Sequence, residues 1–150
     1  MRRATSLALV GAVACSAPPP PQAPAAPEVE YITSAARADL PFSSAVRVGH
    51  LLFLSGQLGT DSTGTLAPGG IAAETRQAMD NIKAVLEQNG SSLDRVVKCL
   101  VMLADIGEWG AMNEVYVTYF PNHKPARSAF GTSGLARGGR LEIECIATLP

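Results

Sequence analysis

Apolar and polar positions follow two different periodicities in this chain. Apolar residues recur every three or four positions from Ile71 to Leu86, which predicts an amphipathic helix closed by Asn89 and Gly90. A second helix is predicted over residues 106–119, and Pro121 stops it. Its expected buried stripe consists of Trp109, Met112, Tyr116 and Tyr119.

Short apolar or alternating segments predict strands over residues 29–33, 45–48, 51–55, 96–103, 126–131 and 140–149. The strand at 96–103 is apolar on both sides except for Lys98, so we expect it to be covered on both faces. In the last strand Leu141 and Ile143 face one way, while Glu142 and Glu144 face the other. The element order, three strands, helix, strand, helix and two strands, predicts one α+β domain over residues 29–150.

The first residues have a different character. Arg2 and Arg3 precede an uncharged run over residues 4–14, which predicts a signal peptide at 1–14. The small residues just before Cys15 resemble a bacterial lipobox, which implies lipidation of Cys15 and an exported, membrane-anchored lipoprotein facing the periplasm or cell exterior. Residues 15–28 are rich in proline and alanine and predict a tether. An ordinary cleaved signal, or a tail with a chance cysteine, remains the alternative.

Composition narrows the classes of function. The formal net charge of the chain is −1, and no block of like charge occurs, so we expect no nucleic-acid partner. His50 and His123 have no partners at metal-ligand spacing, and we predict no metal site. Cys99 and Cys145 lie on expected core strands and are interpreted as buried small hydrophobic residues, with a disulfide left open for an exported chain.

Two features carry candidate chemistry. Arg127 lies among small residues in a predicted strand, where its guanidinium either grips a carboxylate through two parallel bonds or is solvated at a sheet edge. Glu142 and Glu144 share one face of an otherwise apolar strand. Either that face is solvated, or one carboxyl group occupies a pocket that shifts its pKa. Taken alone, each segment favours the solvated interpretation.

Together the segments resemble the Rid family of reactive-intermediate (imine) deaminases. The C-terminal blocks are Pro-Ala-Arg-Ser at 125–128, Leu135, Gly-Gly at 138–139 and Leu-Glu-Ile-Glu at 141–144. The upstream blocks are Pro-Phe-Ser at 41–43, Leu-Ser-Gly-Gln at 54–57, residues 77–86 and Asn-Glu-Val-Tyr at 113–116. They follow the family's order and span nearly everything from residue 29 onward.

This resemblance implies a chorismate-mutase-like βββαβαββ fold: a mixed six-stranded sheet with two helices on one face, assembled as a homotrimer with clefts between subunits. It implies hydrolysis of reactive 2-imino or enamine acids to 2-keto acids and ammonia, as by a 2-iminobutanoate/2-iminopropanoate deaminase, without a cofactor. By position, Arg127 would bind the substrate carboxylate, and Glu142 would activate water. The implied substrate-binding positions are Phe42, Ser55, Gly56, Asn113 and the backbone near Ala129.

Two positions depart from the family pattern. Phe42 stands where a tyrosine is frequent, and Ala129 replaces a frequent cysteine. The lost hydroxyl at Phe42 leaves an alternative function, a non-catalytic trimeric module that binds small carboxylates at the cell envelope. A ribonuclease activity is disfavoured by the lack of a basic stripe.

Overall fold

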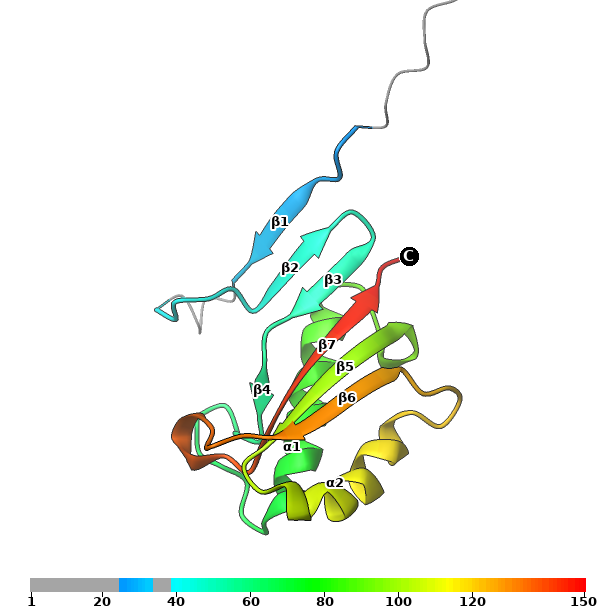
Figure 1. The fold of residues 1–150 in the computed structure, drawn as a ribbon. Coiled ribbons are helices and arrows are strands. Elements are labelled where there is room, and N and C mark those ends of the chain that lie inside the picture. The colour runs from blue at the N-terminus through cyan, green and yellow to red at the C-terminus, as the bar shows by residue number, and fades with distance from the viewer. Residues whose placement is uncertain (1–24, 34–38) are drawn as a thin grey trace, which may run out of the picture.

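The computed structural model describes residues 25–33 and 39–150 (Figure 1). The predicted signal peptide, Cys15 and most of the predicted tether lie outside these residues. The strands are β1 (Val29–Ile32), β2 (Ala45–Val48), β3 (Leu51–Leu54), β4 (Gln57–Leu58), β5 (Val96–Leu103), β6 (Ala126–Gly131) and β7 (Leu141–Thr148). The α-helices are α1 (Ile71–Gln88) and α2 (Trp109–Tyr116).

One mixed sheet forms the centre of the described chain. Its strands lie in the order β1-β2-β3-β7-β5-β6, with only β5 and β6 parallel to each other. Both helices cover the same face of this sheet (Figure 1). The predicted α+β class, with two helices on one face, is confirmed.

The sheet has one strand more than predicted. β4 pairs with β7 just beyond the end of β3, at Gln57 opposite Ile143 and Leu58 opposite Glu142. The segment after residue 55 was expected to be a polar loop, because two residues are too few to show an alternating pattern. This addition matters for the site, since it brings Gly56 beside the middle of β7.

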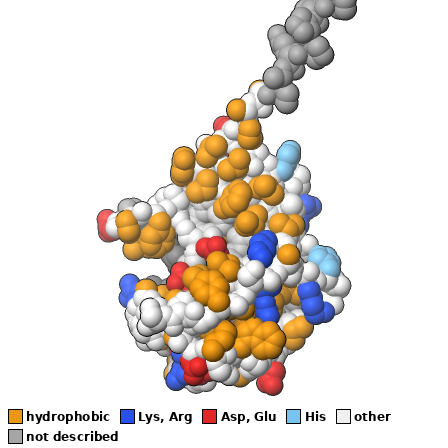
Figure 2. Space-filling model, in the orientation of Figure 1, with side chains coloured by type: hydrophobic (Ala, Val, Ile, Leu, Met, Phe, Trp, Pro, Cys, Tyr) orange, Lys and Arg blue, Asp and Glu red, His pale blue; other side chains and the backbone are white. Residues whose placement is uncertain are grey.

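The hydrophobic core lies between the sheet and the helices. Cys99, Val101 and Leu103 of β5 and Leu141 and Ile143 of β7 are fully buried there. The opposite face of the sheet is open in the single chain: Leu51, Phe53 and Phe130 are exposed, as is Val97 at an irregularity of β5. The expectation that β5 is covered on both faces is therefore wrong for one chain. Figure 2 shows hydrophobic side chains gathered on this open face over β1–β3.

The helices agree with the predicted periodicity, with two differences. α1 buries the expected face and also Glu74, which accepts a 2.8 Å bond from the Arg140 backbone N–H. The second helical segment consists of α2 flanked by the 3₁₀ turns Ile106–Glu108 and Val117–Tyr119. Met112 and Tyr116 are buried as predicted, whereas Trp109 is 47% exposed.

A disulfide joins the two core strands. Cys99 and Cys145 face each other across β5 and β7, and their sulfur atoms are bonded. Both side chains are buried, as expected. The sequence left a disulfide between them open, and the strand register decides the question by placing the two cysteines directly opposite each other.

Candidate active site

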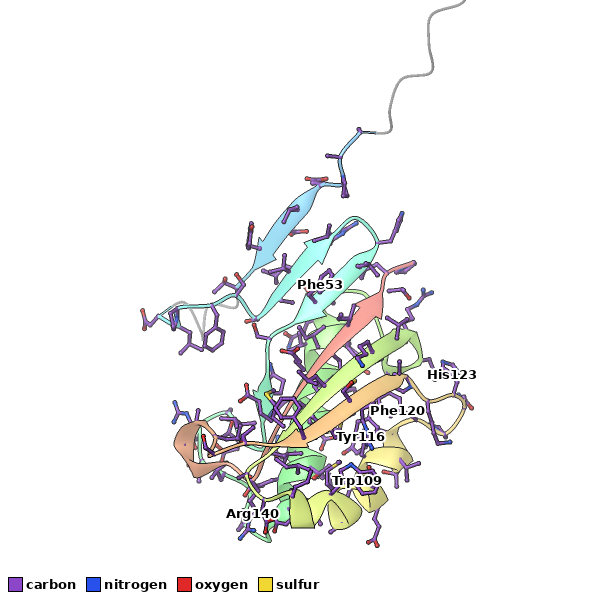
Figure 3. The ribbon with its side chains drawn as sticks, in the orientation of Figure 1. Phe53, Trp109, Tyr116, Phe120, His123 and Arg140 are labelled. Carbon is purple, nitrogen blue, oxygen red and sulfur yellow. A yellow bond between two sulfur atoms is a disulfide. The ribbon has the colours of Figure 1, made fainter. Side chains whose placement is uncertain are left out.

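Arg127 lies on β6 and faces α2. Its guanidinium carbon is 4.7 Å from the ring centroid of Tyr116 and 5.8 Å from that of Trp109. Both rings project from α2 on the side of β6 (Figure 3). The guanidinium of Arg127 makes no ion pair or hydrogen bond with any residue in the described ranges. Its charge is therefore held by aromatic faces, and its N–H groups are left to bind an anion.

A cavity of about 470 Å³ opens beside this arginine. Its walls include Asn113 and Tyr116 from α2, Phe120 from the following turn, and Lys124 from the loop before β6. The structure thus brings Arg127 and Asn113, two of the predicted site residues, to one cavity. The walls are largely apolar, and a carboxylate entering there would meet the arginine in a partly desolvated setting.

Glu142 lies on β7 and lines a separate groove of about 810 Å³. Burial, and then the neighbouring charge of Glu144, raise the pKa of Glu142 above its ordinary value. Such a shift brings a carboxyl group closer to the range in which it exchanges protons efficiently near neutral pH. The carboxyl group of Glu142 makes no hydrogen bond or ion pair within the part of the chain that the structure describes.

Gly56 fixes where the Glu142 carboxyl group can lie. A Cβ atom at position 56 would lie only 2.7 Å from Cδ of Glu142, so the close approach requires glycine. The preceding Ser55 donates its hydroxyl to the Ser43 carbonyl over 2.6 Å, which ties the 39–44 segment to this strand end. Ser55 therefore supports the groove through the backbone, and Gly56 forms its floor.

Arg127 and Glu142 point to opposite faces of the sheet. Arg127 is aligned with Cys99, and Cys99 with Cys145, whose side chain faces the core. Glu142 is three residues from Cys145 on the same strand, so its side chain faces the other way. The single chain therefore does not bring the two predicted catalytic residues together. It presents two half-sites: the Arg127 cavity and the Glu142 groove.

The two departures from the family pattern lie outside the walls of both half-sites. Ala129 follows Arg127 on the same face of β6 and packs, partly buried, against the core. Phe42 is 47% exposed in the 39–44 segment, whose Leu40 lines the Glu142 groove. Neither side chain forms a wall of the cavity beside Arg127.

Several residues of the site are absent from the prediction. Trp109 appears in the sequence only as part of a helix stripe, and Tyr116 as part of that stripe and of the 113–116 block; no spacing rule connects either residue to Arg127. Asn81 of α1 donates to the carbonyl oxygens of Leu58 and Thr60 over 3.1 and 2.9 Å, which holds the loop after β4. Asn81 lies within the continuous helix α1, and a polar residue beside the buried Ile82 was the available signal.

The metal-ligating residue types do not cluster. Among residues 25–33 and 39–150, no group of three or more histidine, cysteine, aspartate or glutamate side chains lies close enough to hold a metal ion. His123 instead contacts the Asp94 carbonyl oxygen over 2.7 Å. The candidate chemistry therefore concerns Arg127, Glu142 and their neighbours.

Comparisons with known proteins identify the family. Residues 32–149 match the family model described as Endoribonuclease L-PSP. The 2-iminobutanoate/2-iminopropanoate deaminase of Mus musculus is 45% identical over 77% of this chain and 86% of its own length. A yeast protein structure, YEO7, superposes with a TM-score of 0.77 and 42% identity, covering 82% of this chain and all of its own. RidA from Psychrobacter gives 0.74 and 37%, covering 80% and 100%.

The chain belongs to this family, which is the one expected from the motifs. The fold prediction is confirmed by the same comparisons. So is the prediction of an enzyme related to the deaminases that hydrolyse C–N bonds, given relatives so named at 43–46% identity. The alternative, a non-catalytic binding module at the envelope, has no support among these relatives.

The prediction of an exported lipoprotein is wrong. The relatives from mouse, yeast and Pyrococcus horikoshii match over 86%, 88% and 96% of their own lengths, and none of their names describes a lipoprotein. The short apolar run before Cys15 imitates a signal because small apolar residues and two arginines suffice for the pattern. In the described part of the chain, no helix is long and apolar enough to cross a membrane.

Proposed function

From its family membership and its two half-sites, we propose that this chain hydrolyses reactive 2-imino and enamine acids to 2-keto acids and ammonia. The observation that carries the proposal is the placement of Arg127 and Glu142 on opposite faces of one sheet. Each has the properties needed for one part of the reaction, and neither half-site holds both. The catalytic domain is proposed to span residues 29–150, and each active site is proposed to form between two copies of it.

The Arg127 half-site would bind the substrate. A guanidinium with no anionic partner among the described residues suits a carboxylate, which it holds through two parallel hydrogen bonds. Asn113 lines the same cavity and offers an amide for the nitrogen-bearing end of the substrate. The backbone near Ala129, two residues along β6, is proposed to contact that same end.

The Glu142 half-site would supply water and move protons. An enamine first gains a proton on carbon and loses one from nitrogen, which makes it the imine. Water then adds to the imine carbon while Glu142 accepts a proton from it, and the same carboxyl group gives that proton to nitrogen. Glu142 next carries the proton of the new hydroxyl group to the amino nitrogen, and the C–N bond breaks as the carbonyl forms, so that one imine and one water yield one keto acid and one ammonia. Ser55 and Gly56 would keep this carboxyl group at the substrate.

We propose that three copies assemble so that the half-sites meet. The open face of the sheet exposes Leu51, Phe53 and Phe130, which are costly to leave in water and suited to contact another copy. A ring of identical subunits places one face of each chain against a different face of the next. That arrangement joins the Arg127 cavity of one copy to the Glu142 groove of its neighbour.

The word endoribonuclease in the family's description does not alter this proposal. Twelve lysines and arginines against thirteen aspartates and glutamates give no excess of positive charge for a phosphate backbone. The residues described above include no Walker-type or histidine-paired nucleolytic arrangement. No cofactor is part of the proposed reaction, because imine hydrolysis requires only a held carboxylate, a placed water and a proton carrier.

The test is imine hydrolysis by the purified full-length chain. An amino-acid oxidase generates 2-imino acids in the presence of semicarbazide, which competes for them, and the formation of keto acid is measured. We expect the wild type to hydrolyse the imines, Arg127→Ala to raise KM, and Glu142→Gln to lower kcat. A folded wild-type protein without activity on a panel of aliphatic imino acids would overturn the proposal.

A further inference from the structure

The guanidinium of Arg127 is unusual in its surroundings. Most half-buried arginines pair with a carboxylate, but Arg127 has no ion-pair partner among residues 25–33 and 39–150. It is flanked instead by the rings of Tyr116 and Trp109, at 4.7 and 5.8 Å. Both distances lie within the range in which an aromatic face attracts a cation.

We propose that Trp109 and Tyr116 are positioning residues, an aromatic clamp that orients Arg127 for the substrate carboxylate without neutralising its charge. The inference rests on the proposed function, because it assigns the clamp to the arginine that binds substrate. An acidic partner would orient the guanidinium equally well but would compete with the substrate. Ring faces attract the cation while leaving its in-plane N–H groups free.

The hydroxyl of Tyr116 does not explain this contact. It is buried and has no hydrogen-bond partner among the described residues. Burial raises the pKa of Tyr116 to about 12, against the opposing effect of Arg127, so the phenol stays neutral. A neutral phenol forms no ion pair with the guanidinium. The ring of Tyr116 is therefore what acts on Arg127.

The exposure of Trp109 distinguishes a role in orienting Arg127 from a role in core packing alone. Trp109 is 47% exposed, at the start of α2, whereas Tyr116 is buried against Phe120 with ring centroids 5.0 Å apart. A tryptophan that served only the core would not remain half in solvent. Substitution of Trp109 should therefore leave the fold intact, whereas a smaller residue at the buried Tyr116 would leave a cavity in the core.

Trp109 also supplies a direct readout, since it is the only tryptophan of the chain. We propose to titrate the full-length protein with 2-oxobutanoate and follow tryptophan fluorescence and binding calorimetry. The wild type should show a saturable emission change that Arg127→Ala abolishes. Trp109→Leu should weaken 2-oxobutanoate binding measured by calorimetry about three- to tenfold and raise KM by a similar factor, with kcat nearly unchanged.

Two further variants make the test specific. Tyr116→Phe keeps the ring and should bind 2-oxobutanoate as the wild type does, without loss of thermal stability. Tyr119→Leu is the matched control: Tyr119 contacts Arg76 and Asp80 of α1 rather than Arg127, so affinity should not change. Unchanged affinity in Trp109→Leu, or an equal loss in Tyr119→Leu, would overturn the clamp even if hydrolysis is observed.

The clamp can be judged separately from the reaction. The Arg127 side-chain N–H signal in NMR, assigned by its absence in Arg127→Lys, should be displaced by the ring currents of Trp109 and Tyr116. In Trp109→Leu that displacement should shrink without any ligand. If the wild type neither hydrolyses imines nor binds 2-oxobutanoate, the proposed function fails, and an unshifted Arg127 signal in Trp109→Leu would independently refute the clamp.

Discussion

The Arg127 cavity and the Glu142 groove each contain one ionisable side chain, and the surroundings of the two side chains differ. Arg127 lies between aromatic rings, in a cavity of about 470 Å³ with few polar groups. Glu142 lies in a larger groove against a glycine, where burial and then a second carboxylate raise its pKa. The first environment keeps a permanent cation available to an anion. The second makes a carboxyl group readier to bind a proton.

The comparison shows how binding and proton transfer can be separated on one sheet. Because side chains alternate along a strand, neighbouring strands can present a binding group to one face and a proton carrier to the other. The cost is that a single chain cannot complete the site. The proposed assembly restores the site by placing unlike faces of two copies together.

The largest effect is expected from Glu142→Gln. Removing the proton carrier should lower kcat about 10²- to 10⁴-fold. The same change should stabilise the fold at neutral pH, because burial and Glu144 disfavour the charged form of Glu142. A raised pKa in the folded state contributes stability below the ordinary value of 4.5, and that stability is lost as pH rises through the folded pKa.

Thermal denaturation of Glu142→Gln and the wild type over a pH series checks this sign. The variant should melt at a higher temperature near pH 7, and the difference should close toward acid pH. A variant that loses both activity and neutral-pH stability would show that Glu142 is a structural residue.

A smaller effect is expected from Gly56→Ala. The added Cβ would collide with the Glu142 side chain and displace its carboxyl group, which should lower kcat about 10- to 100-fold. In the Glu142→Gln background the same change should cost little more, because the displaced group is already inactive. Steady-state kinetics of the four proteins measure this coupling. Equal losses of kcat in the wild-type and Glu142→Gln backgrounds would show that Gly56 does not act through Glu142.

The smallest effect is expected from Glu144→Gln. Removing the like charge should lower the pKa of Glu142 and move the acid limb of the kcat/KM profile to lower pH. Glu87→Gln, on the exposed side of α1, should leave the limb in place. An acid limb that does not move in Glu144→Gln would assign that limb to another group.

Sequence alone predicted most of the fold because long periodic segments carry it. The alternation of 140–149 and the helical spacing after Ile71 placed the core correctly. β4 was missed because two residues are too few to show an alternating pattern. Trp109 was wrongly predicted to be buried, because the spacing of apolar residues along a helix does not reveal where the sheet beneath it ends. The apolar run before Cys15 led to the opposite kind of error: its pattern was clear, but the localisation inferred from it was wrong.

The candidate residues were predictable, but their arrangement was not. The motifs indicated Arg127, Asn113, Gly56 and Glu142, and the structure places each beside a cavity or groove. That the arginine and the glutamate face opposite ways follows from the β5–β6 and β5–β7 registers, which short-range patterns do not determine. The aromatic neighbours of Arg127 depend on the same long-range contacts.

Subunit complementation tests the central claim most directly. Arg127→Ala and Glu142→Gln chains, carrying different tags, are co-expressed, and the mixed assemblies are purified through both tags. If each site takes its arginine from one copy and its glutamate from the next, every mixed trimer keeps one intact site in three, and the purified mixed assemblies should show about a third of wild-type activity. Activity no greater than that of the two parent variants would contradict a site shared between copies.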